Sequence, residues 1–105
     1  MKRKPTHPGE MLREEFMPDY NLTVAKLAEL LGTTRQTVNE LINERRSLSV
    51  DLAVRLACLF DTTPQYWINM QNALDIYNAE QKCSEAYQTI TPIAQIVEFK
   101  TSTAV

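Results

Sequence analysis

The sequence predicts an all-α fold, in which a bundle of five helices is followed by an extended C-terminal tail. Through most of the chain, apolar side chains recur at intervals of three and four, which is the spacing of amphipathic helices. Residues that start helices, such as Thr23 and the pair Thr63-Pro64, precede these segments. From Thr89 to Phe99 the chain is instead rich in β-branched residues and contains Pro92, so we expect extended backbone there.

The 105 residues predict one domain, because a chain of this length buries a single core. We expect the domain to occupy residues 1–83, and residues 84–105 to form an extended or flexible tail. With 44% hydrophobic and 23% charged residues, the composition is that of a globular protein. No apolar run is long enough to span a membrane, and the basic N-terminus lacks the apolar stretch of a secretory signal. We therefore expect a cytoplasmic protein with no membrane partner.

The first helix is predicted to begin near Pro8, whose fixed φ suits the first helical position. Leu12 and Phe16 lie four residues apart and give this helix one apolar side. We expect the helix to end at Pro18, because proline cannot continue the hydrogen-bond pattern.

The second and third helices follow each other closely. Thr23 is a favourable N-cap for the second helix, and Gly32 ends it as a left-handed residue. Its buried side is expected to consist of Val24, Leu27, Ala28 and Leu31. Thr33 or Thr34 caps the third helix, and a polar loop at 43–47 follows it. The buried stripe of the third helix is expected to consist of Val38, Leu41 and Ile42.

The fourth helix is predicted to begin after Ser49, and the fifth to run from Thr63-Pro64 to about Cys83. The fourth helix is expected to pack through Leu52, Leu56 and Phe60. Cys58 lies on an apolar run of the same helix, so we expect it in the core. The spacing of the two cysteines matches no metal site, which favours reduced structural thiols.

Three residues at fixed offsets indicate a helix-turn-helix. Ala28 is small where two helices cross closely, and Gly32 can take the left-handed conformation of a sharp turn. Val38 lies where the third helix packs back onto the second. An αα-hairpin within an all-helical bundle is the alternative interpretation.

The exposed side of the third helix favours the helix-turn-helix. Its polar residues, all candidate base readers, are Thr34, Arg35, Gln36, Thr37, Asn39 and Glu40. Arginine binds guanine and glutamine or asparagine binds adenine through two hydrogen bonds, and a threonine methyl contacts thymine. We therefore expect Arg35 and Gln36 to be the main readers. Glu40 either accepts a hydrogen bond from cytosine or is a solvated charge that repels phosphate. The alternative interpretation of all six residues is a polar surface that only keeps the helix soluble.

Phosphate contacts are expected beside this helix, from the loop after it and from the start of the second helix. The candidates are Thr23, Lys26, Arg45, Arg46 and Ser47. The net charge of −2 speaks against a nucleic-acid partner, but the charge is unevenly distributed. Residues 1–55 hold nine Lys/Arg and eight Asp/Glu, whereas residues 56–105 hold two and five. The more basic half therefore carries the predicted interface with double-stranded DNA.

The fifth helix, at about residues 64–83, is long enough to serve both the core and a twofold partner in a homodimer. The candidate dimer contacts are Tyr66, Met70, Ala73, Leu74, Ile76 and Tyr77. The alternative is that all of them belong to the monomer core. The tail includes Ile93, Ile96, Val97 and Phe99; it pairs with a partner subunit, contacts another protein, or is a loose terminus.

No group of residues predicts catalysis, a metal site or a cofactor. His7 is the one histidine and stands beside Pro8 at a helix start, so we expect it to cap that helix. Glu14 and Glu15 are adjacent and face different ways from a helix, which excludes an acid–base pair. No spacing suits metal ligands, and we therefore expect that the protein is not an enzyme.

From HPGEMLREEF to TPQYWINMQNALDIY, at about residues 7–80, the chain resembles the HigA-type (VapI-like) antitoxins of the Xre/Cro family. Residues 7–10 and 63–67, which open the first and fifth helices, distinguish this branch from generic repressors. The segment GTTRQTVNELIN also resembles the recognition helices of lambdoid phage repressors. The loop Glu44-Arg45-Arg46 departs from the family pattern, which has a short glycine-containing turn there.

The resemblance implies a lambda-repressor-like fold and a homodimer that represses its own operon by binding the operator. It also implies that the protein binds and neutralises a small toxin, HigB, a ribonuclease that cleaves mRNA. The ribonuclease chemistry would belong to that partner. The alternative function is a stand-alone Xre/Cro-type transcriptional regulator without a toxin partner.

Overall fold

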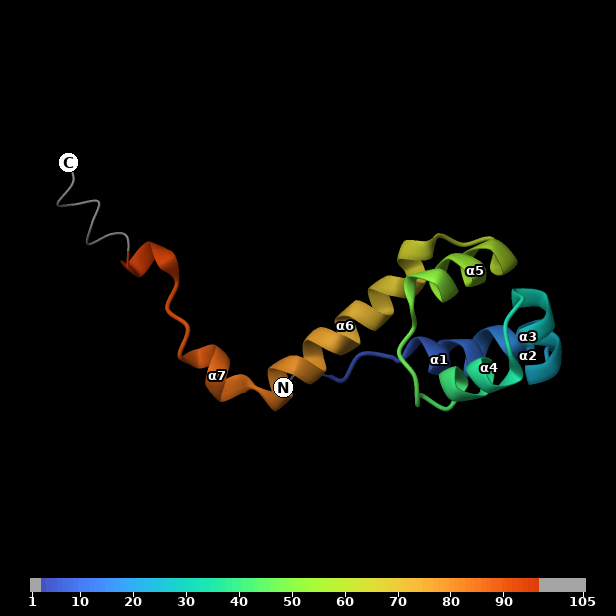
Figure 1. Cartoon of the computed structure of the whole chain (residues 1–105), viewed down its shortest axis with the longest axis horizontal. Coiled ribbons are helices and arrows are strands. Elements are labelled where there is room, and N and C mark those ends of the chain that lie inside the picture. Colours follow the sequence, from blue (N-terminus) through green and yellow to red (C-terminus); the bar gives the residue numbers. More distant parts are fainter. Residues whose placement is uncertain (1–2, 97–105) are drawn as a thin grey trace.

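The computed structural model describes residues 3–96, which form a helical body and a long arm that projects from it (Figure 1). The arm consists of residues 75–96. The molecule measures 66 × 26 × 22 Å, and its radius of gyration is 19.8 Å. A compact domain of this length would have a radius of gyration of about 13 Å. No strand occurs within residues 3–96, and the predicted all-α class is confirmed.

The first helix is continuous but contains a wide turn. Its segments are α1 (Pro8–Met11), the π-helical η1 (Leu12–Phe16) and α2 (Met17–Asp19). Pro18 has no N–H, and its ring crowds the carbonyl four residues earlier, which explains why the preceding turn opens. In that turn the Met17 N–H bonds to the Leu12 carbonyl, five residues back. The predicted end at Pro18 is therefore wrong, since the helix continues to Asp19 and the chain reverses at Asn21, whose φ is 55°.

The predicted pair of helices is present as α3 (Val24–Leu31) and α4 (Arg35–Ile42). Thr23 caps α3 and Thr34, not Thr33, caps α4. Gly32 turns the chain between them with φ of 71°. Ala28 and Val38 are buried, as the spacing predicts.

α5 (Val50–Phe60) and the first part of α6 (Pro64–Lys82) complete the body, and the rest of α6 begins the arm. Ser49 and Thr63 cap the two helices as predicted. The body closes around Trp67, which is fully buried. Its indole N–H donates to Thr62 Oγ1 over 2.8 Å, and its ring lies 4.8 Å from that of Phe16. Other core residues include Leu12, Leu27, Leu41, Leu52 and Leu56.

Two predictions about the second half are wrong. Cys58 is exposed, because α5 turns Leu56 and Ala57 inward and the next position faces solvent. The tail is not extended throughout: α7 (Ser84–Gln88) and residues 93–96 are helical. Residues 97–105, with Val97 and Phe99, lie outside the described part. None of the described helices is long and apolar enough to cross a bilayer.

Candidate nucleic-acid interface

The polar side of α4, which we call the α4 face, consists of the six candidate base readers: Thr34, Arg35, Gln36, Thr37, Asn39 and Glu40. Arg35, Gln36 and Asn39 are exposed, whereas Glu40 is half-buried. Spacings of three and four residues place Arg35, Gln36, Asn39 and Glu40 on one side of the helix, whereas Thr34 precedes the helix as its cap and Thr37 is half-buried. The structure thus brings the principal candidates together on a solvent-facing surface.

The threonines and the asparagine of the α4 face also hold the ends of the helix. Thr34 Oγ1 accepts from the Thr37 N–H at 3.1 Å, and the two threonine hydroxyls lie 2.9 Å apart. At the other end, Asn43 Nδ2 donates to the carbonyl and to the side-chain oxygen of Asn39, at 2.8 and 3.1 Å. Arg35 and Gln36 are therefore the exposed readers that are not needed to cap the helix.

Glu40 joins the α4 face to the following loop. Its Oε2 accepts from Gln36 Nε2 at 3.2 Å, and its Oε1 accepts from Nε and Nη2 of Arg46 at 3.1 and 3.0 Å. The hydrogen bond from Gln36, and then that from Arg46, lower the pKa of Glu40 below its usual value. The carboxylate is thus ionised and engaged at neutral pH.

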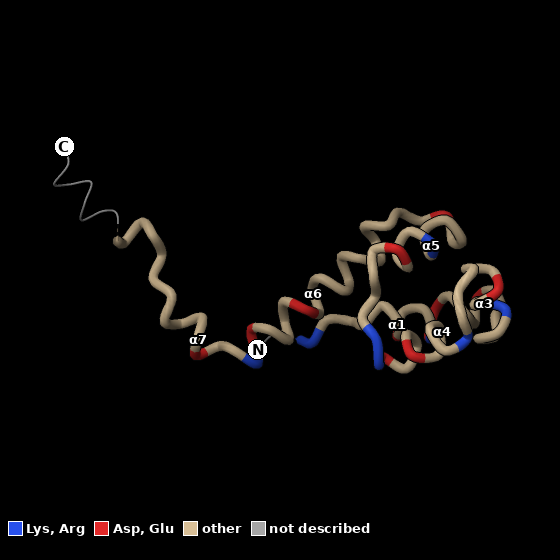
Figure 2. Tube along the Cα trace, viewed as in Figure 1, with Lys and Arg blue, Asp and Glu red and all other residues tan. Residues whose placement is uncertain are grey.

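The candidate phosphate contacts lie at both ends of α4. Thr23 and Lys26, together with Arg35, line an open hollow between the starts of α3 and α4. Arg45 and Ser47 are exposed in the loop after α4, beside Arg46. Lysines and arginines accordingly lie around α3, α4 and this loop (Figure 2). Lys26 also pairs with Glu29 at 3.0 Å, an exposed contact that contributes little.

Arg13 holds the loop after α4, a role that the sequence reading missed. Its guanidinium donates to the carbonyl of Ile42 at the end of α4 and to Glu44 Oε2 at 3.4 Å. Glu44 has φ of 60°, and the Arg45 N–H donates to the Glu40 carbonyl over 2.8 Å. Arg13 lies 29 residues before Ile42. No local pattern reports a contact at that separation.

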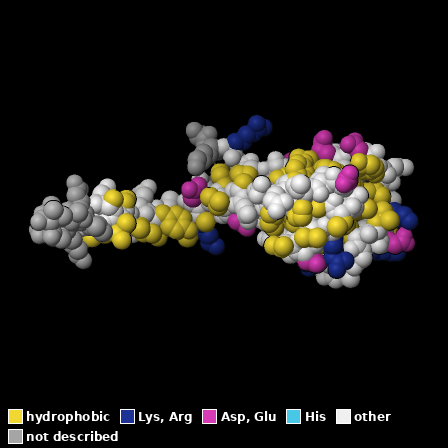
Figure 3. Space-filling view, turned by 90° about the horizontal axis from the view of Figure 1, so that it is seen from above, with side chains coloured by type: hydrophobic (Ala, Val, Ile, Leu, Met, Phe, Trp, Pro, Cys, Tyr) yellow, Lys and Arg dark blue, Asp and Glu magenta, His cyan; other side chains and the backbone are white. Residues whose placement is uncertain are grey.

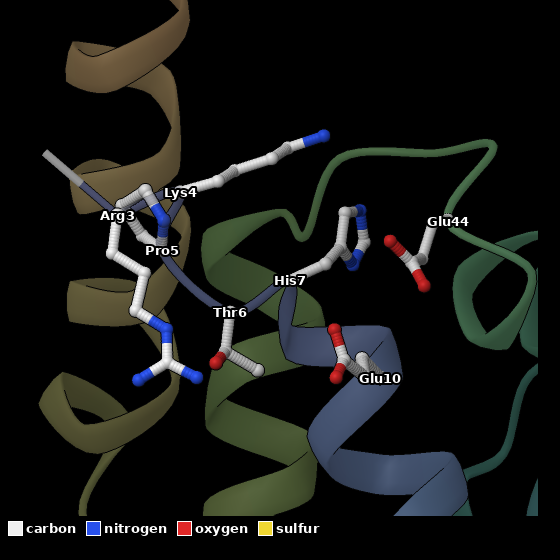
Figure 4. A pocket seen from close by; sticks show the side chains of 7 residues that line it. All are labelled: Arg3, Lys4, Pro5, Thr6, His7, Glu10 and Glu44. Carbon is white, nitrogen blue, oxygen red and sulfur yellow. The ribbon is translucent and has the colours of Figure 1, made fainter. Parts of the chain in front are cut away.

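His7 connects the same loop to α1. Its Nδ1 accepts from the Gly9 N–H at 2.9 Å, which confirms the predicted cap. The ring is buried, and burial lowers the pKa of His7, whereas Glu44 acts in the opposite direction. Figure 4 shows the Glu44 carboxylate facing this ring, with the Arg3 side chain on the other side of the pocket.

The candidate dimer contacts divide into two groups. Tyr66, Ala73 and Ile76 are exposed, and Met70 and Tyr77 are half-buried. Leu74 is buried in the core of its own chain, so it supports α6 from within and presents no surface to a partner. Hydrophobic side chains also line the arm where it leaves the body (Figure 3).

Comparisons with known proteins agree with this architecture. The helix-turn-helix family matches residues 12–67, which is more than half of the chain. Antitoxin HigA-1 of Vibrio cholerae is 36% identical over 88% of this chain and 87% of its own length. An uncharacterised HTH-type transcriptional regulator of Haemophilus influenzae is 40% identical over 76% of this chain and 75% of its own.

A solved structure of Pseudomonas aeruginosa antitoxin HigA with the higBA promoter superposes with a TM-score of 0.80. It is 37% identical and covers 84% of this chain and 97% of its own. The predicted resemblance is confirmed, and the αα-hairpin alternative is excluded. The chain belongs to the helix-turn-helix family, in the branch of the HigA-type antitoxins.

Proposed function

We propose that this chain is an antitoxin that binds the operator of its own operon as a homodimer, represses transcription, and neutralises an mRNA-cleaving toxin of the HigB type. The exposed α4 face carries the proposal, and the relative solved with a promoter supports it. In a helix-turn-helix, the first residues of the second helix enter the major groove. Here those residues include Arg35 and Gln36.

The flanking residues suit the positioning part of the interaction. Thr23 and Lys26 lie before the α4 face and Arg45 and Ser47 after it, so phosphates on either side of a major groove can be contacted together. Such contacts add affinity without sequence information. In a homodimer, two α4 helices would lie about one DNA turn apart and read two half-sites.

The toxin part of the proposal follows from the family and from charge. Residues 56–105 hold two basic and five acidic residues, which would attract a basic ribonuclease. In this arrangement the toxin supplies the RNA-cleaving chemistry and the antitoxin has no catalytic role.

Operator binding is tested by gel shift with a duplex from upstream of the operon and a shuffled duplex of equal length. Wild type should shift the upstream duplex preferentially, and Arg35→Ala should cost about 1–3 kcal/mol at one base pair. The double variant Arg35→Ala, Gln36→Ala should lose the preference. Lys82→Ala removes one charge from the arm and should bind like wild type. An undiminished preference in the double variant contradicts the assigned readers, and no shift by wild type contradicts operator binding.

Toxin neutralisation is tested by co-expression with the adjacent gene. A stable complex on size exclusion, together with rescue of growth, supports the antitoxin. A stand-alone transcriptional regulator is the second candidate function, favoured by the Haemophilus relative's description as a regulator. Operator binding without complex formation or growth rescue would favour that second function.

A further inference from the structure

One carboxylate holds two residues of different predicted roles. Glu40 Oε2 accepts from Gln36, a candidate base reader, while Oε1 accepts two hydrogen bonds from Arg46, a candidate phosphate contact. We propose that Glu40 is a positioning residue for operator recognition, which orients Gln36 toward adenine and withholds the Arg46 charge from unrelated DNA. This inference rests on the proposed operator binding.

The orientation of the Gln36 amide follows from the chemistry of its partner. A carboxylate only accepts hydrogen bonds, so the amide nitrogen of Gln36, and not its oxygen, must face Glu40. One amide N–H and the amide oxygen then remain for another partner. Adenine presents an acceptor at N7 and a donor at N6 in the major groove, which is the complementary pair. Glu40 thereby selects the adenine-reading orientation before DNA is bound.

The charge of Arg46 is occupied in the same geometry. Two of its N–H groups point at Glu40 over 3.0–3.1 Å, and an incoming phosphate meets the Glu40 carboxylate beside that guanidinium. Arg46 therefore displaces few counterions from an arbitrary duplex and adds little to the affinity for it. On the operator, base contacts by Arg35 and Gln36 offset the free-energy cost of separating Arg46 from Glu40. Specificity arises because only the operator supplies that compensation.

The loop after α4 brings Arg46 back toward Glu40. The Arg45 N–H donates to the Glu40 carbonyl over 2.8 Å, and the left-handed Glu44 reverses the chain. Arg13 contacts both Ile42 and Glu44. The loop that carries Arg46 is consequently held in place by these contacts, and with it the pair of Glu40 and Arg46. A glutamate is charged throughout the neutral range, and the lowered pKa of Glu40 extends its charged form further toward acid pH.

The test measures Glu40→Ala and Glu40→Gln on the upstream and shuffled duplexes over a series of salt concentrations. We expect affinity for the shuffled duplex to rise about five- to tenfold near 0.1 M salt, since one further phosphate contact steepens the salt slope by about 0.9. Operator affinity should change little, because Glu40→Ala removes the cost of separating Arg46 from Glu40, which offsets the lost orientation of Gln36. The preference for the operator should therefore fall by about five- to tenfold.

Two controls separate positioning from simple repulsion. Glu85→Gln on the arm makes the same change in net charge as Glu40→Gln and should leave both affinities unchanged. In an Arg46→Ala background, Glu40→Ala should no longer raise affinity for the shuffled duplex. An equal rise in that background, or an unchanged preference in Glu40→Ala, overturns the inference.

A measurement without DNA separates this inference from the proposed function. The NMR signal of the Arg46 Nε–H should exchange more slowly with water in wild type than in Glu40→Gln. Equal exchange rates overturn the inference whatever the DNA result. Slow exchange in a wild type that does not prefer the operator contradicts operator binding instead, and leaves the pair of Glu40 and Arg46 intact.

Discussion

The first turn of α1 depends on a neutral imidazole. His7 Nδ1 accepts from the Gly9 N–H, so this nitrogen must be unprotonated for the cap to exist. Burial lowers the pKa of His7 and favours that state, although Glu44 and Glu10 favour the proton. Protonation would turn the accepting nitrogen into a donor and remove the cap.

The stability of the fold should therefore fall in mild acid. The pKa of His7 is lower in the folded chain, so the unfolded chain binds the proton more readily. The contribution of His7 is complete above about pH 6.5 and declines as the pH falls through that value. His7→Asn keeps a side-chain acceptor for the Gly9 N–H but does not titrate. Melting temperatures from pH 8 to pH 5.5 should fall more for wild type than for His7→Asn, and parallel curves would contradict the assignment.

Single residues are predictable where their role is local. The caps at Thr23, Ser49 and Thr63 follow from the sequence, because each oxygen accepts from an N–H three residues later. Gln71 does not: it is buried, its Oε1 accepts from the Leu48 N–H at 2.7 Å, and its Nε2 donates to Asp75 at 2.8 Å. That contact joins residues 23 apart, and a glutamine within an apolar stripe gives no sign of it.

The two glycines are needed for two different reasons. A Cβ on Gly9 would lie 1.7 Å from the Leu41 carbonyl oxygen, so α1 and α4 are in direct backbone contact there. Gly32 has open space except for Arg55 Nη1 at 3.1 Å, but its φ of 71° is costly for other residues. The first glycine is required for packing and the second for conformation.

Alanine at these positions should separate the two causes. Gly32→Ala should lower the free energy of unfolding by about 1–2 kcal/mol, the cost of a left-handed residue with a side chain. Gly9→Ala should lower it by more than about 3 kcal/mol, because backbone and not a flexible side chain must move. Urea unfolding measures both. Similar losses for the two variants would contradict the close contact of α1 and α4.

Helix boundaries were predictable where a cap or a turn is encoded locally, as at Thr23 and Gly32. They were not predictable where a proline changes the turn before it: Pro18 widens η1, and the helix does not end there. The helical turns at Ser84–Gln88 and 93–96 also escaped prediction. At 93–96 the reason is local, because Pro92 and the β-branched residues favour extended backbone. The α4 face itself was predictable, since its polar positions and the buried stripe of Val38, Leu41 and Ile42 follow helical spacing; its link to Arg46 through Glu40 depends on the loop conformation.

At the scale of the molecule, the arm leaves apolar side chains in solvent. Ile76 is 59% exposed, and Ile90 and Ile93 are 69% and 72% exposed. From residue 86 to residue 96 the arm carries no charged residue, so no charged side chain of that segment accompanies its exposed apolar ones. Burial of these side chains would stabilise an assembly by about 25 cal/mol per Å² of apolar surface. The proposed homodimer provides such burial and also pairs two α4 helices.

Ile76→Lys should therefore convert the proposed dimer into a monomer. Position 76 lies on the exposed side of α6 and lysine is a good helix former, so the helix itself tolerates the lysine while an apolar interface does not. Sedimentation equilibrium should give the mass of two chains for wild type and of one for Ile76→Lys. Asn78→Lys adds the same charge about 200° around the helix and should remain dimeric.

Because a monomer reads one half-site, Ile76→Lys should also lose most of its affinity for a duplex with two half-sites. Its affinity for a duplex with a single half-site should change little. A dimeric Ile76→Lys, or a monomeric wild type, would contradict the placement of the dimer interface on this side of α6.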